Sequence, residues 1–145
     1  FEASLERYAA HQLTSELASI EAPDAGADAI REAFDGYAAA SDGWARGRGC
    51  LLCNTAVERV ALDPGSARHV AAYLERLTTA FRSCLANAST RGDIATDADL
   101  DQLAAFFTTA LIGVAASLRA EAPPGQVRAA CSVATSVLDQ HSSTA

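Results

Sequence analysis

Two of the four cysteines stand three residues apart, in Cys50-Leu51-Leu52-Cys53. On a helix, residues at this spacing lie on neighbouring faces, so both sulfurs could reach one metal ion. A structural zinc site needs four ligands, and no second pair of Cys, His, Asp or Glu follows at a suitable spacing. We therefore expect neither a metal nor a cofactor at these thiols.

The same spacing also suits thiol redox chemistry. Such a site needs a base close to the second cysteine, typically histidine, to form the thiolate. The chain continues without a nearby histidine, so only Arg46, Arg48 and a helix N-terminus are present to favour a thiolate. Two buried thiols in a core helix are the preferred interpretation, and a helical thiol oxidoreductase using Cys50 and Cys53 is the alternative.

No other group of residues predicts catalysis. The three histidines, His11, His69 and His141, fall on different predicted helices. The glycines of residues 46–49 lack the Lys-Ser/Thr that completes a phosphate loop. The aspartates of residues 93–101 lack the glycine and closing glutamate of a calcium loop. We expect no catalytic residue and no enzyme activity.

Composition and charge narrow the class of protein further. The chain has 145 residues, 50% of them hydrophobic, which suits one domain with a substantial core. Its 11 basic residues are all arginines, and 18 carboxylates give a net charge of −7, so nucleic-acid binding by this chain alone is not expected. Sparse cysteines fit a reducing cytoplasm, and Thr108, Thr109 and Gly113 interrupt the longest apolar stretch, which argues against a membrane protein.

The elements that carry these residues are predicted to be helices. Alanine is abundant, alternating apolar runs are lacking, and apolar residues recur every three or four positions. Asp63-Pro64 is a strong signal for the start of a helix, and Gly92 is a signal for its end. Asp99 with Gln102 forms a variant of the capping box, which predicts the start of the next helix. The sequence thus predicts an all-α fold of about six helices, near residues 1–20, 27–40, 49–60, 64–89, 100–120 and 125–141.

The chain also resembles a known family. Gly49, Cys50, Leu51, Leu52, Asn54 and Glu58 match, in order, a Gly-Cys-Leu-Leu-x-Asn-x-x-x-Glu segment common in the C-terminal region of TetR-family (tetracycline repressor-type) bacterial transcription regulators. The turn at residues 91–94 and the spacing from Leu103-Ala104 to Gly113 are similar as well. The likeness covers nearly the whole chain.

This resemblance implies a domain organisation and a set of partners. Residues 1–145 would form the C-terminal ligand-binding and dimerisation domain of a ligand-responsive regulator. The chain contains no methionine and opens within helical sequence, so we expect a further segment to precede it. The resemblance implies that this segment is a helix-turn-helix DNA-binding domain. The partners would be a second copy of the chain, a small effector that shifts the first helix, and operator DNA through the preceding domain only.

Candidate ligand-binding residues are large or polarisable side chains where predicted helix faces meet. For each of them an ordinary core position is the alternative, and polar tips on apolar faces make Tyr37, Asn54 and Tyr73 the best candidates. These faces carry no obvious charge, which predicts a neutral or weakly polar hydrophobic effector. Trp44 either caps the cavity or covers the core edge. The full set is Leu13, Leu17, Phe34, Tyr37, Leu51, Asn54, Tyr73, Leu77, Phe81 and Phe106.

The predicted helix at residues 100–120 is apolar nearly all round, so both of its sides should be covered. If two subunits pair their last two helices, the resulting four-helix bundle removes this apolar surface from water. The predicted homodimer interface is Ala105, Thr109, Ile112, Ala116, Val133 and Val137.

Overall fold

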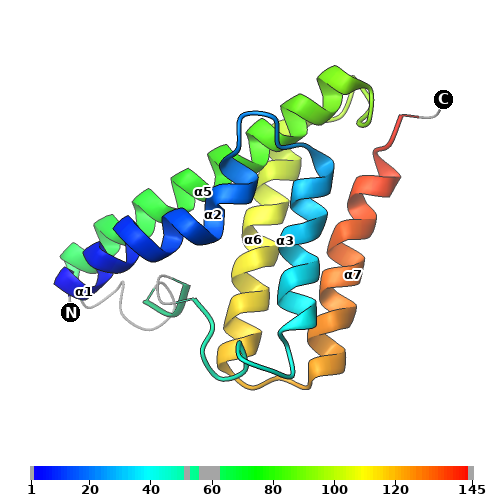
Figure 1. Cartoon of the computed structure of the whole chain (residues 1–145). Coiled ribbons are helices and arrows are strands. Elements are labelled where there is room, and N and C mark those ends of the chain that lie inside the picture. The colour runs from blue at the N-terminus through cyan, green and yellow to red at the C-terminus, as the bar shows by residue number, and fades with distance from the viewer. Residues whose placement is uncertain (1, 51–52, 56–62, 144–145) are drawn as a thin grey trace.

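The computed structural model describes residues 2–50, 53–55 and 63–143, and this part of the chain is helical (Figure 1). An isolated bridge between Ile94 and Ser142 is its only strand-like pairing. The all-α prediction is therefore confirmed. In chain order the elements are α1 (Glu2–Arg7), η1 (Tyr8–Gln12), α2 (Leu13–Glu21), α3 (Ala27–Ala39), α5 (Pro64–Arg91), α6 (Leu100–Arg119) and α7 (Pro124–Gln140).

Local sequence signals set the ends of the long helices. Asp63 caps α5 by accepting hydrogen bonds from the backbone amides of Gly65 at 3.1 Å and Ser66 at 3.3 Å. Gly92 ends α5 in the left-handed region, with φ 82°. Asp99 caps α6 by accepting from the amide of Gln102 at 3.0 Å. These three predicted boundaries are confirmed.

The first helical stretch differs from the single α-helix that was predicted. A π-helical turn, η1, separates α1 from α2, and the stretch continues to Glu21. A π turn shifts the register of the side chains that follow it, and such turns often occur at functional sites. Here the turn carries Tyr8, whose hydroxyl donates to Cys50 Sγ at 3.7 Å.

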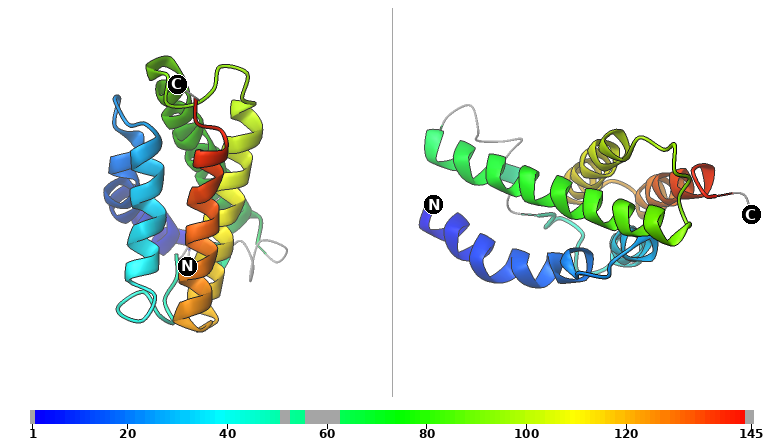
Figure 2. Two further views of the ribbon diagram at one scale, coloured as in Figure 1. Left: turned by 90° about the vertical axis from the view of Figure 1, so that its right-hand side faces the viewer. Right: turned by 90° about the horizontal axis from the view of Figure 1, so that it is seen from above.

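The helices form two groups. α3, α6 and α7 run side by side, whereas α1–α2 and α5 run obliquely across them and extend beyond them toward the N-terminus (Figure 1). The view from above shows α2 next to α5, with α6 and α7 seen end-on (Figure 2). The closest pairings are α5 with α6 and α3 with α7.

Three aromatic rings fill the centre of this packing. Phe34 of α3, Phe81 of α5 and Phe107 of α6 are fully buried, and their ring centroids lie 5.9 to 6.4 Å apart. Tilted and offset rings at this distance attract one another in addition to the benefit of burial. The cluster therefore packs α3, α5 and α6 against one another.

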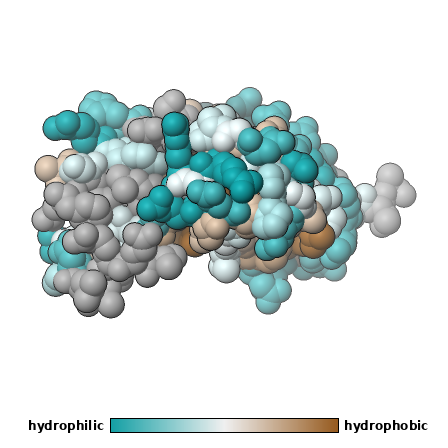
Figure 3. Space-filling model, turned by 90° about the horizontal axis from the view of Figure 1, so that it is seen from below, coloured by the Kyte–Doolittle hydropathy of each residue, from teal (hydrophilic) through white to brown (hydrophobic). Residues whose placement is uncertain are grey.

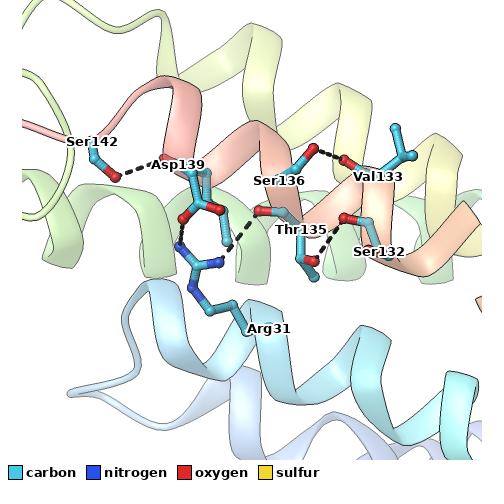
Figure 4. A network of polar contacts seen from close by, with 8 residues as sticks. Arg31, Ser132, Val133, Thr135, Ser136, Asp139 and Ser142 are labelled. Carbon is cyan, nitrogen blue, oxygen red and sulfur yellow. Dashed lines mark hydrogen bonds and ion pairs between the residues drawn. The ribbon is translucent and has the colours of Figure 1, made fainter. Parts of the chain in front are cut away.

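An arginine joins α3 to α7 at the surface. Arg31 donates to Asp139 Oδ1 at 2.7 Å and to the backbone oxygen of Thr135 at 3.4 Å (Figure 4). Because the Asp139 side chain is 68% exposed, this ion pair orients the two helices more than it stabilises them.

Within the described residues, one helix is long and apolar enough to cross a membrane. It is α6, and 39% of its most apolar window is buried inside the subunit. A core helix of a globular protein passes the same test of length and composition.

Candidate functional site

A cavity of about 280 Å³ lies where α2 diverges from α3, α5 and α6. Its volume is close to the lower end of the range for small-molecule sites. The wall combines apolar side chains with two tyrosines, a tryptophan, a serine and a glutamate. The lining residues are Leu17, Ser19, Ile20, Glu32, Ala33, Gly36, Tyr37, Trp44, Ala45, Gly49, Tyr73 and Leu111.

Tyr73 of α5 connects this wall to the cysteine pair. Its ring is 5% exposed, and its hydroxyl lies 3.7 Å from Cys53 Sγ and accepts a hydrogen bond from Cys50 Sγ at 3.9 Å. Burial raises the pKa of the Tyr73 phenol, and the nearby Cys50, Cys53 and Tyr37 add to the rise. Tyr73 therefore stays a neutral phenol at physiological pH.

The segment with two Arg-Gly pairs closes one side of the cavity. Gly47 donates its amide to the backbone oxygen of Leu118 at 2.8 Å, and Arg119 Nη1 donates to the backbone oxygen of Gly47 at 2.9 Å. Both contacts tie the segment to the C-terminal turn of α6, where backbone carbonyls lack helical partners.

Gly49 explains why glycine is needed in this segment. Its φ is +62°, and an added Cβ would lie 2.7 Å from the backbone oxygen of Ala115. The first condition favours glycine, and the second excludes any side chain unless the backbone moves. Gly49 thus allows the segment to pack closely on α6.

The side chain of Asn54 also contacts the segment with two Arg-Gly pairs. Its Nδ2 donates to the backbone oxygen of Arg48 at 2.9 Å. Its Oδ1 is buried and has no hydrogen-bond partner among the described residues. Asn54 therefore positions the segment next to the cavity and is not itself part of the wall.

Comparisons with known proteins agree with this architecture. Residues 26–134 match the model of a family described as "Tetracyclin repressor-like, C-terminal domain". The chain belongs to this tetracyclin repressor-like family. The "Uncharacterized HTH-type transcriptional regulator YezE" of Bacillus subtilis (strain 168) is 27% identical over 121 residues, which cover 83% of this chain. The aligned region spans 62% of that relative's length. No solved structure matches the chain significantly.

In this tetracyclin repressor-like domain, three of the predicted ligand-binding residues line the cavity: Leu17, Tyr37 and Tyr73. Phe34, Leu77 and Phe81 are instead fully buried in the core. Phe34 and Phe81 belong to the aromatic cluster between α3, α5 and α6. Leu51 lies outside the described residues, and so does the side chain of Leu13.

Phe106 is placed away from the cavity. It lies on the outer side of α6, is 39% exposed, and lines a groove between α6 and α7. Helical periodicity accounts for this position, since the neighbouring Phe107 points into the core and Phe106 must then point about 100° away from it. Their rings meet edge to face at 5.2 Å.

The cavity residues that sequence reasoning missed come mainly from α3 and the segment after it. Glu32, Ala33 and Gly36 share one side of α3 with the predicted Tyr37, so their spacing alone could have flagged a carboxylate beside small residues. Ala45, Gly49 and Leu111 offered no such signal. Trp44, for which two roles were open, lines the cavity while remaining 68% exposed.

The six residues predicted for a dimer interface all retain exposure in the single chain. Ala105 and Thr109 are exposed, Ile112, Ala116 and Val137 are half-buried, and Val133 is 66% exposed. Beside them the groove between α6 and α7 is lined by small residues, including Ala110, Gly113, Ala129 and Ala130. Pairing of two subunits through this surface remains a prediction.

Proposed function

We propose that this chain is the effector-sensing and dimerising part of a cytoplasmic TetR-type transcription regulator. A small molecule bound in the cavity would act on α2, and two copies of the chain would pair through α6 and α7. DNA binding would belong to a helix-turn-helix domain in the same regulator, in keeping with the printed name of the Bacillus subtilis relative. The chain would have no enzymatic role.

The observation that carries this proposal is the position of the cavity. Leu17, Ser19 and Ile20 of α2 form one wall, and the opposite wall comes from α3, α5 and α6. A ligand that fills the space must therefore contact α2 directly, so its binding energy can favour one position of α2 over another.

The apolar surface on α6 and α7 supports the dimer. Phe106 and Val133 rank among the most exposed large hydrophobic side chains of the described residues. Soluble monomers rarely leave a contiguous apolar groove open to water. A second copy would cover this groove by the same residues on both sides.

Native mass spectrometry tests both parts of the proposal. The protein is measured before and after incubation with an extract of small hydrophobic metabolites. We expect a dimer that carries a small ligand. A matched pair of variants makes the test specific: Gly36→Leu fills the cavity, whereas Gly125→Leu adds the same side chain on α7, and an added Cβ has free space at both positions.

The proposal requires that Gly36→Leu loses the ligand while Gly125→Leu keeps it. A monomer without ligand in the unmodified protein would overturn both parts. A ligand that survives equally in both variants would show that it binds elsewhere.

A further inference from the structure

We infer that the cavity selects a small hydrophobic cation, such as an alkyl or aryl ammonium ion, as its ligand. This inference rests on the proposed function and names the chemical class of the effector. The charge-free wall expected from sequence does not hold, because Glu32 belongs to the lining, and among the described residues no arginine or histidine does. The part of the lining that the structure describes thus carries a single negative charge.

Glu32 is available to a ligand. None of the ion pairs among the described residues includes it, although Arg31, its neighbour in sequence, pairs with Asp139. Its side chain is solvent-exposed on α3, so it lies at the mouth of the cavity and not in its depth. A carboxylate in this position can meet a cationic head group without the cost of burying an unpaired charge.

Three aromatic rings share this cavity with Glu32. Trp44 is largely exposed, Tyr37 is half-buried, and Tyr73 is buried. Aromatic faces attract cations, and tryptophan does so most strongly. The hydroxyl of Tyr73 contacts the thiols of Cys50 and Cys53, and these contacts fix the position of the Tyr73 ring in the wall of the cavity.

The remaining wall suits the apolar part of such a ligand. Leu17, Ile20 and Leu111 lie among the deep lining residues, together with Ala33 and Ala45. A molecule with a charged group at Glu32, a contact with the aromatic rings and a hydrophobic body against the leucines matches this wall. Figure 3 shows mostly hydrophilic surface at the lower end of the molecule, interrupted by hydrophobic side chains.

Two isosteric probes separate the effect of charge from that of shape. Phenyltrimethylammonium is cationic, and tert-butylbenzene has the same shape with carbon in place of the charged nitrogen. Trp44 is the only tryptophan in the chain and lines the cavity, so its fluorescence reports binding of either probe. Calorimetry replaces fluorescence for variants that lack Trp44.

We expect the cation to bind more tightly than the neutral probe, and added salt to weaken only the cation. Glu32→Gln should weaken cation binding about 1.4- to fivefold, the range for an exposed ion pair, and leave the neutral probe unchanged. Trp44→Leu should weaken the cation about two- to fivefold. Asp35→Asn is the matched control, because it removes a charge one turn further along α3 from a residue outside the cavity lining.

Equal binding of the two probes, with no effect of Glu32→Gln, would overturn the cation class and leave the effector cavity standing. Equal effects of Glu32→Gln and Asp35→Asn would also overturn it, since overall charge and not the site would then be responsible. If neither probe binds, the inference is wrong, and the native mass spectra decide whether the proposed function falls with it.

Discussion

The hydroxyl oxygen of Tyr73 lies 3.7 Å from the sulfur of Cys53, so the wall of the cavity and the Cys-x-x-Cys segment are in direct contact. Cys50 reaches the same hydroxyl, and Tyr8 from the π-helical turn reaches Cys50. These contacts join Tyr8 of η1, Tyr73 of α5 and the thiols of Cys50 and Cys53 into one polar cluster beside the cavity. The cysteines therefore have a structural role that needs no catalysis.

Tyr73→Phe should reduce the free energy of unfolding by about 1 kcal/mol, because it removes a buried hydroxyl from between two thiols. Urea denaturation measures this change.

Cys53→Ser should preserve ligand binding and dimerisation, since the cysteines are not needed as nucleophiles in a regulator. A peroxidase activity that disappears in Cys53→Ser would favour the thiol oxidoreductase instead.

Stability should decline at alkaline pH. Burial raises the pKa of Cys84 from its ordinary 9.0 to about 11, and its thiol donates to the backbone oxygen of Ile20 at 3.2 Å. Between these values the unfolded chain releases the Cys84 proton and the folded chain retains it, so the free energy of unfolding falls as pH rises. The raised pKa of Tyr73, whose ordinary value is 10.0, acts in the same direction.

Urea midpoints measured at about pH 8 and about pH 10.5 test this dependence. Cys84→Ala should show a smaller decrease between the two pH values, because only Tyr73 and Cys131, whose pKa is also raised by burial, then contribute through the raised pKa values of the described residues. A decrease of the same size in both proteins would exclude Cys84 as the cause.

Gly49→Ala should destabilise the protein by at least about 1 kcal/mol, because alanine meets both a left-handed backbone and the oxygen of Ala115. Thermal unfolding gives the measurement. Gly125→Ala is the control: an added Cβ there has free space, and alanine is the better helix former. Equal stability of the two variants would contradict the close approach of residue 49 to α6.

Val133→Glu should convert the dimer to a monomer, because it places a charge on an exposed residue that lines the apolar groove between α6 and α7. Light scattering after size-exclusion chromatography measures the mass. Ser132→Glu adds the same charge at an exposed neighbour on α7 that does not line the groove, and it should remain dimeric. Two variants with the same mass would place the dimer interface elsewhere.

Much of the fold follows from short-range rules. Asp63-Pro64 starts α5 and Gly92 ends it, because an aspartate side chain satisfies free amides and glycine accepts a left-handed backbone. The all-α class follows from apolar spacing along the chain. The π turn at Tyr8–Gln12 escaped prediction, since the surrounding residues fit an uninterrupted helix equally well.

The cavity was only partly predictable. Leu17, Tyr37 and Tyr73 combine an apolar helix face with bulk or a polar tip, and those properties are local. Phe34 and Phe81 have the same local properties but meet Phe107 in the core. Periodicity tells which side of a helix faces inward, but it does not tell whether the inward space is filled.

The sequence by itself determined the class of fold, the ends of the long helices, the apolar stripes and the family resemblance, because each depends on residues close together in the chain. Only the tertiary structure decided which inward side chains border empty space and which touch one another. Glu32 and Trp44 reach the same cavity because α3 and the following segment fold around it, and no local rule brings them together. That arrangement sets the chemistry proposed for the ligand.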